Sequence, residues 1–102
     1  MILDQLLLRK KKIMSKQNIR NIILDAGHGG INAQGLYTTL GKYFVFPSGE
    51  IAYEGVINRA IVSAMAHKLR LAGKNVVFTV DPANPKDISL KDRVTNANKY
   101  SA

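Results

Sequence analysis

The chain has 102 residues, of which 46% are hydrophobic, and a formal net charge of +8. This length allows one small domain, and the hydrophobic fraction is that of a globular protein. The sequence contains no cysteine, which excludes disulfides, thiolate metal ligands and cysteine nucleophiles. Any metal site would therefore need imidazole and carboxylate ligands.

The positive charge is concentrated at the N-terminus. Residues 1–20 carry a net +5, which leaves +3 for the remaining 82 residues. We expect residues 1–19 to form a basic, disordered leader, with Met1 and Met14 as alternative starts. The apolar residues 6–8 precede the charges, the reverse of a secretory signal, and no segment is long enough to span a membrane. We therefore expect synthesis in the cytoplasm without a signal peptide.

The most informative stretch is Asn21–Gly30, an apolar run that stops at a glycine-rich turn carrying His28. Short apolar runs of this kind are typical of strands buried on both faces of a parallel sheet. A long irregular segment follows, from Gly27 to about Ala52, and loops of this length are usually functional. Within it, Tyr43–Phe46 is expected to form either a short strand or a hydrophobic flap.

Residues 54–72 show helical spacing and end before Gly73, a typical helix C-cap residue. The spacing predicts that Arg59, Ser63 and Arg70 face solvent. The predicted buried face consists of Val56, Ile57, Ala60, Ile61, Ala64, Met65, Leu69 and Leu71. A second buried strand over 75–80 and a last helix, from Ser89 to about Tyr100, complete the pattern.

This alternation of strands and helices predicts an α/β fold, with a parallel sheet and a right-handed crossover. Open parallel sheets normally have four to six strands, and this chain supplies two. We therefore expect an α/β domain that is incomplete at its C-terminus.

The topology brings His28 and Glu54 to the same edge of the sheet, because strand C-termini and helix N-termini meet there. An imidazole and a carboxylate at an open edge are a plausible pair of zinc ligands, with Asp25 orienting the histidine ring. The alternative is that His28 is a solvated loop residue and Glu54 interacts with the helix dipole. His67 lies about 20 Å along the helix from Glu54 and cannot be a third ligand; we expect it at the edge of the core.

Other sites have less support. The glycine-rich turn lacks both the spacing of a dinucleotide fingerprint and a P-loop lysine. Ser48 and Ser63 have no evident histidine partner for nucleophilic catalysis. Asp87, Asp92 and Arg93 are most simply helix-start and surface charges.

Four ordered motifs carry a family resemblance. They are Ile23–Gly30, Tyr53–Gly55 at the helix start, Val76–Thr79, and Asp87–Arg93 followed by Ala97-Asn98. Together they resemble the zinc-dependent N-acetylmuramoyl-L-alanine amidases of the amidase-3 type, in versions found in phage lysins and related bacterial enzymes. The resemblance implies an open twisted sheet with flanking helices (phosphorylase/hydrolase-like), in which residues 20–102 form the N-terminal half of the catalytic domain.

The resemblance also implies a reaction and a site. These enzymes cut the amide between N-acetylmuramic acid and L-alanine in peptidoglycan, so the target lies in the cell wall or periplasm. His28 and Glu54 match the first two Zn²⁺ ligands. The third ligand and the catalytic glutamate would fall beyond Ala102, so no catalytic residue lies within this chain and we expect it to be inactive alone. A missing C-terminal half of the domain would then be its partner. The arginine that often follows the family's threonine is replaced here by Val80, after Thr79.

Two other interpretations remain open. The chain could be a non-catalytic basic module that binds cell wall or, less plausibly, nucleic acid through its leader, in which case binding would fall steeply with salt. It could also be an inactive remnant of a fragmented gene.

Overall fold

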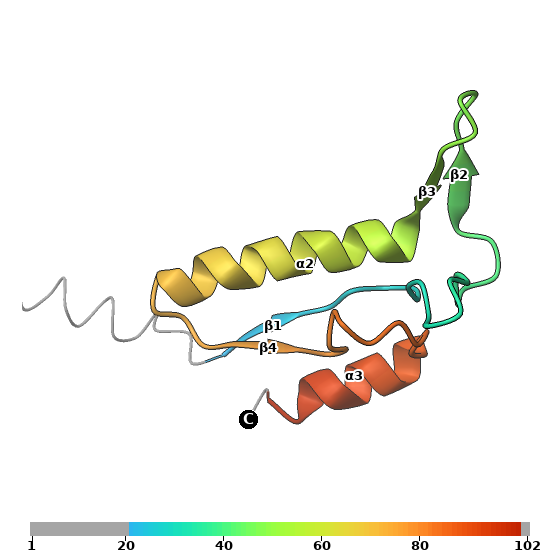
Figure 1. The fold of residues 1–102 in the computed structure, drawn as a ribbon. Coiled ribbons are helices and arrows are strands. Elements are labelled where there is room, and N and C mark those ends of the chain that lie inside the picture. Colours follow the sequence, from blue (N-terminus) through green and yellow to red (C-terminus); the bar gives the residue numbers. More distant parts are fainter. Residues whose placement is uncertain (1–20, 101–102) are drawn as a thin grey trace, which may run out of the picture.

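The computed structural model describes residues 21–100 (Figure 1). The predicted leader, residues 1–19, lies outside the described residues. The elements in chain order are β1 (Ile22–Leu24), β2 (Tyr43–Val45), β3 (Ile51–Tyr53), α2 (Glu54–Leu71), β4 (Val76–Phe78) and α3 (Leu90–Asn98). Among these, no helix combines the length and apolar character needed to cross a bilayer.

The centre of the fold is a parallel pair of strands between two helices. β1 pairs with β4 in a register that places Ile22 opposite Val76 and Leu24 opposite Phe78. The connecting helix α2 lies over one face of this pair and α3 lies over the other (Figure 1). The predicted α/β class and parallel pairing are confirmed.

The ends of both helices also match the predictions. Gly73, just after α2, adopts the left-handed φ of +80° that glycine tolerates best. Ser89 caps α3, because its side chain accepts a hydrogen bond from the backbone N–H of Asp92.

The predicted buried face of α2 is wrong except at Leu69, which is partly buried against the core. The buried residues of the helix are Gly55, Arg59, Val62 and Ala66, whereas Ile57, Ile61 and Met65 are 45–52% exposed. Hydrophobic residues occur all around this helix, so their spacing does not identify the face that meets the sheet. The short side chains of Val62 and Ala66 are the ones that pack in the core with Leu24, Ala26 and Val76.

The long segment between β1 and α2 contains an antiparallel hairpin. Tyr43 pairs with Tyr53 and Val45 pairs with Ile51, so β2 and β3 form a second, separate two-stranded sheet. The hairpin projects from the N-terminal end of α2 (Figure 1). Of the two alternatives for Tyr43–Phe46, a short strand or a hydrophobic flap, the structure shows a strand, while its partner β3 was not predicted.

Candidate metal centre

The loop after β1 is held by the first turns of α2. Asn58 Nδ2 donates to the carbonyl of Gly27 at 3.1 Å, and Arg59 Nη1 donates to the carbonyls of His28 and Gly29 at 2.6 and 2.8 Å. Three consecutive carbonyls are therefore fixed by two neighbouring helix residues. His28 sits in the middle with φ +65°, a left-handed conformation that non-glycine residues adopt only when their surroundings enforce it.

Arg59 also connects the loop after β1 to the loop between β4 and α3. Its side chain also donates from Nε to Asn84 at 3.1 Å and from Nη2 to Lys86 at 3.2 Å, both at backbone carbonyls. It is only 6% exposed, which corrects its predicted place on the solvent face. Burial lowers the pKa of Arg59, and the charges of Asp87 and Tyr37 oppose that change. Since arginine has a very high ordinary pKa, the group stays charged.

A close contact between two glycines brings His28 and Glu54 together. A Cβ on Gly55 would lie 1.8 Å from the carbonyl oxygen of Gly29, so only glycine allows α2 to approach the loop this closely. His28 and Glu54 are the residues directly before these glycines. The structure thus confirms that both residues lie where the loop after β1 meets the start of α2.

The side chains of His28 and Glu54 are available for binding. Within residues 21–100 neither side chain has a hydrogen-bond or ion-pair partner, and His28 is partly exposed while Glu54 is exposed. An imidazole nitrogen and a carboxylate oxygen on a fixed backbone are donors that suit Zn²⁺. The donor set therefore fits part of a zinc site.

The segment before the hairpin also binds the loop after β1, through the backbone N–H groups of Gly29 and Gly30. Thr39 Oγ1 accepts a hydrogen bond from the Gly29 N–H at 2.6 Å and donates to Asp87 Oδ2 at 2.9 Å. Thr38 Oγ1 accepts from the Gly30 N–H at 3.1 Å. These threonines were not identified from the sequence, because nothing in their spacing shows that they fold back onto the loop.

Tyr37 provides the cap that α2 lacks at its own N-cap residue. Tyr53 makes no side-chain capping bond, and the Gly55 N–H instead donates to the Tyr37 hydroxyl at 2.9 Å. The backbone N–H of Glu54 donates to the carbonyl of Lys42 at 3.1 Å. The segment 37–42 therefore fixes the backbone at Glu54 and Gly55.

Asp25, at the end of β1, is bound by two other side chains. Thr79 Oγ1 donates to its Oδ1 at 2.6 Å, and Arg93 Nη1 forms an ion pair with its Oδ2 at 2.5 Å. Burial alone would raise the pKa of Asp25, but the hydrogen bonds from Thr79 and Arg93 and the charge of Arg93 lower it below its ordinary value. Arg93 was predicted to be a plain surface charge. The ion pair with Asp25 shows instead that it connects α3 to β1. The orientation of His28 by Asp25 stays a prediction.

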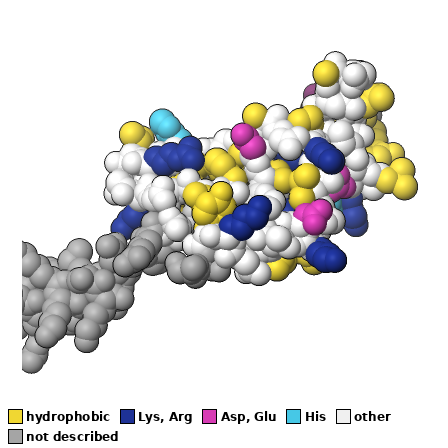
Figure 2. Space-filling model, turned by 90° about the horizontal axis from the view of Figure 1, so that it is seen from below, with side chains coloured by type: hydrophobic (Ala, Val, Ile, Leu, Met, Phe, Trp, Pro, Cys, Tyr) yellow, Lys and Arg dark blue, Asp and Glu magenta, His cyan; other side chains and the backbone are white. Residues whose placement is uncertain are grey.

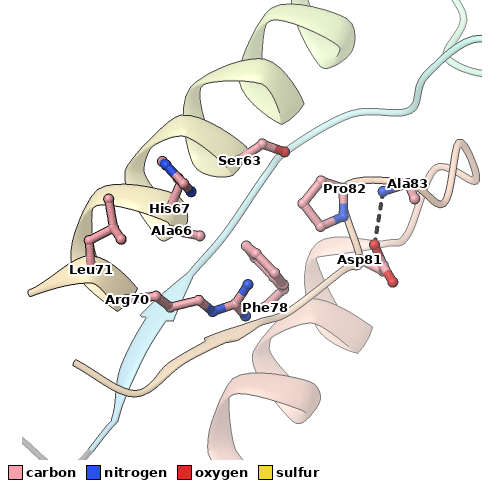
Figure 3. A pocket seen from close by; sticks show the side chains of 9 residues that line it. All are labelled: Ser63, Ala66, His67, Arg70, Leu71, Phe78, Asp81, Pro82 and Ala83. Carbon is pink, nitrogen blue, oxygen red and sulfur yellow. Dashed lines mark hydrogen bonds between the residues drawn. The ribbon is translucent and has the colours of Figure 1, made fainter. Parts of the chain in front are cut away.

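At this edge the described part of the chain brings together two candidate ligands, His28 and Glu54. No group of three or more His, Asp or Glu side chains within residues 21–100 could hold a metal ion. His67 lines a different groove together with Ser63, Arg70 and Phe78, in which the Arg70 guanidinium lies over the Phe78 ring (Figure 3). It is exposed, not at the edge of the core as expected.

The charges of the described residues do not gather into one basic surface on the face seen in Figure 2. Lys and Arg side chains form separate spots there, whereas hydrophobic side chains gather at the end of the molecule that carries the hairpin. Arg59 and Arg93 are engaged with carbonyls and with Asp25. The alternative basic binding module would act through the leader, which lies outside the described residues, so that alternative stays a prediction.

Comparison with known proteins gave one match. Residues 22–102, most of the chain, match the Amidase_3 family model, described as N-acetylmuramoyl-L-alanine amidase. No curated protein and no solved structure matched the chain. The matched range includes every element and every residue of the candidate site. The chain belongs to the Amidase_3 family of N-acetylmuramoyl-L-alanine amidases.

Proposed function

We propose that the chain carries part of the zinc site of an enzyme that hydrolyses the amide between N-acetylmuramic acid and L-alanine in peptidoglycan. His28 and Glu54 would supply the first two zinc ligands. The observation that carries this proposal is the contact between Gly29 and Gly55, which brings these two residues to one edge. Membership of the amidase family supplies the reaction class.

The residues of the site have separable tasks in this proposal. A zinc ion held by His28, Glu54 and a further ligand would supply Lewis-acid chemistry, lowering the pKa of a bound water to about 7 and polarising the scissile carbonyl. His28 would bind through a neutral ring nitrogen and Glu54 through its carboxylate. Arg59 and Asn58 keep the His28 backbone in place, while Tyr37 keeps the start of α2 in place. These contacts hold both ligands before substrate arrives, which lowers the entropic cost of the reaction.

A catalytic zinc usually takes three ligands from the protein. Within residues 21–100 we assign two, so we propose that the third ligand and the general base come from outside this range. We also propose that residues 20–102 form the N-terminal half of the catalytic domain. The cell wall or periplasm would be the place of action. A chain with two ligands should bind zinc weakly and should not hydrolyse peptidoglycan.

Calorimetric titration of zinc into the metal-free chain tests the site. We expect one equivalent to bind, and we expect His28→Ala and Glu54→Gln each to weaken binding by at least about tenfold. His67→Ala is the matched control, because His67 is an exposed histidine on the same helix as Glu54. Equal zinc affinity in the wild type and both site variants would overturn the proposed ligands.

An assay for new N-terminal alanine tests the incompleteness of the site. Cleavage of the muramoyl–alanine amide exposes the amino group of L-alanine, which can be labelled and counted. We expect the 102-residue chain with zinc to release no more alanine termini than a buffer control. Release that depends on His28 would show that the ligand set is complete without further residues.

A further inference from the structure

A groove at the base of the hairpin lies directly beside the candidate metal centre. We call it the tyrosine groove; its walls include Tyr37, Thr39, Tyr43, Val45, Ile51 and Tyr53, and its volume is about 590 Å³. Tyr53 immediately precedes Glu54, and the Tyr37 hydroxyl accepts the hydrogen bond from Gly55. The same residues therefore line the groove and fix the start of α2.

Three tyrosine rings form one continuous surface in this groove. The Tyr37 and Tyr53 ring centroids are 4.7 Å apart, and those of Tyr43 and Tyr53 are 6.1 Å apart, with tilted ring planes in both pairs. Tyr43 remains 53% exposed and Ile51 42% exposed. Large ring surfaces that stay open to solvent while fixed by their neighbours are typical of binding surfaces.

Only one face of the hairpin lines the tyrosine groove. Tyr43 and Val45 of β2 line it, and Phe44, between them, does not. Side chains alternate between the faces of a strand, so Phe44 points to the opposite side. Its ring packs against Phe46 there, with centroids 5.0 Å apart. Hydrophobic side chains are visible on this projecting end of the molecule (Figure 2).

The chemistry of the groove selects one part of the proposed substrate. None of the residues that line it carries a charge, and hydroxyl groups of tyrosine and threonine supply its polar atoms. The stem peptide of peptidoglycan carries carboxylate and amine groups, which would lose hydration in such a groove without gaining an ionic partner. An N-acetylhexosamine ring is uncharged, has apolar C–H faces that pack on aromatic rings, and has hydroxyls that form hydrogen bonds.

We propose that the tyrosine groove binds an N-acetylhexosamine unit of the glycan strand next to the scissile amide. This inference rests on the proposed function, because it takes the glycan from the same substrate. The groove would hold the sugar while His28 and Glu54 face the amide at the adjoining edge. Sugar binding would need no metal, since no residue of the groove is a proposed ligand.

NMR titration of the full, metal-free chain with chitotetraose, the N-acetylglucosamine tetramer, tests the proposal. We expect saturable shifts of the Tyr43, Ile51 and Tyr53 amides. Tyr43→Ala should weaken binding about fivefold to tenfold, while Tyr43→Phe, which keeps the ring, should retain most of it. Phe44→Ala is the matched control, because it removes a similarly exposed ring from the other face of the same strand.

The outcomes separate this inference from the proposed function. Absence of saturable shifts with chitotetraose would overturn the sugar assignment, and intact zinc binding in the same preparation would leave the metal site standing. A tetrapeptide of the stem sequence that binds in place of the sugar, and loses binding in Tyr43→Ala, would also overturn it. Equal loss in Tyr43→Ala and Phe44→Ala would contradict the assignment to this face.

Discussion

Arg59 donates a hydrogen bond of 2.6 Å to the backbone carbonyl of His28, although the two residues are 31 positions apart in the chain. This bond runs from the helix that begins with Glu54 to the loop that carries the other proposed ligand. The backbone geometry of the proposed metal site therefore depends on a buried cation that binds backbone carbonyls and neither proposed ligand side chain. Its removal should affect stability and zinc binding together.

Replacement of Arg59 by methionine should be strongly destabilising. The variant removes the hydrogen bonds from Arg59 to the carbonyls of His28, Gly29, Asn84 and Lys86, and a hydrogen bond to a charged group contributes about 1.5–3 kcal/mol. We expect the free energy of unfolding to fall by at least about 3 kcal/mol in urea denaturation. Lys68→Met, at an exposed position of the same helix, should change it by less than about 0.5 kcal/mol. Similar losses in both variants would contradict this role of Arg59.

Gly55→Ala should destabilise the protein although alanine is the better helix former. Helix propensity alone would stabilise the variant by about 1 kcal/mol, but its Cβ would lie 1.8 Å from the Gly29 carbonyl oxygen. We expect lower thermal stability and weaker zinc binding. Gly27→Ala is the control, because its Cβ would meet nothing closer than 3.8 Å. A Gly55→Ala protein as stable as the wild type would show that α2 does not contact the loop this closely.

Tyr37→Phe tests the cap at the start of α2. The variant keeps the aromatic ring and removes only the hydroxyl that accepts the Gly55 N–H. The loss of a helix cap should cost about 1 kcal/mol and speed the hydrogen exchange of the Gly55 amide. Tyr43→Phe removes a hydroxyl from the same groove without touching the helix and should leave that exchange rate unchanged. Unaltered exchange in Tyr37→Phe would rule out the cap.

The contribution of Asp25 should vanish in acid. Its pKa is lowered in the folded protein, so its ionised form stabilises the fold above the ordinary carboxyl pKa of about 4, and this stabilisation is lost as the pH falls through the folded pKa. We expect Asp25→Asn to lower the melting temperature at pH 7 and to approach the wild type near pH 3. Glu50→Gln, at an exposed position of the hairpin, is the matched control. A difference in melting temperature between Asp25→Asn and the wild type that widens in acid would contradict a lowered pKa of Asp25 in the folded protein.

The parts of the fold set by local pattern were predictable. β1, α2, β4 and α3 follow from apolar runs and capping residues, and the sheet edge that joins His28 to Glu54 follows from their order. The buried face of α2 was not predictable, because the partners of Arg59 are carbonyls in two distant loops. The roles of Tyr37 and Thr39 were missed for the same reason, since both depend on how a long irregular segment folds back.

The two histidines of the chain allow a direct test of the metal centre. In a zinc titration followed by NMR of the imidazole nitrogens, we expect the His28 ring signals to shift with bound zinc. The signals of His67, which lines a different groove, should stay in place. A zinc-dependent shift at His67 with none at His28 would contradict the proposed centre.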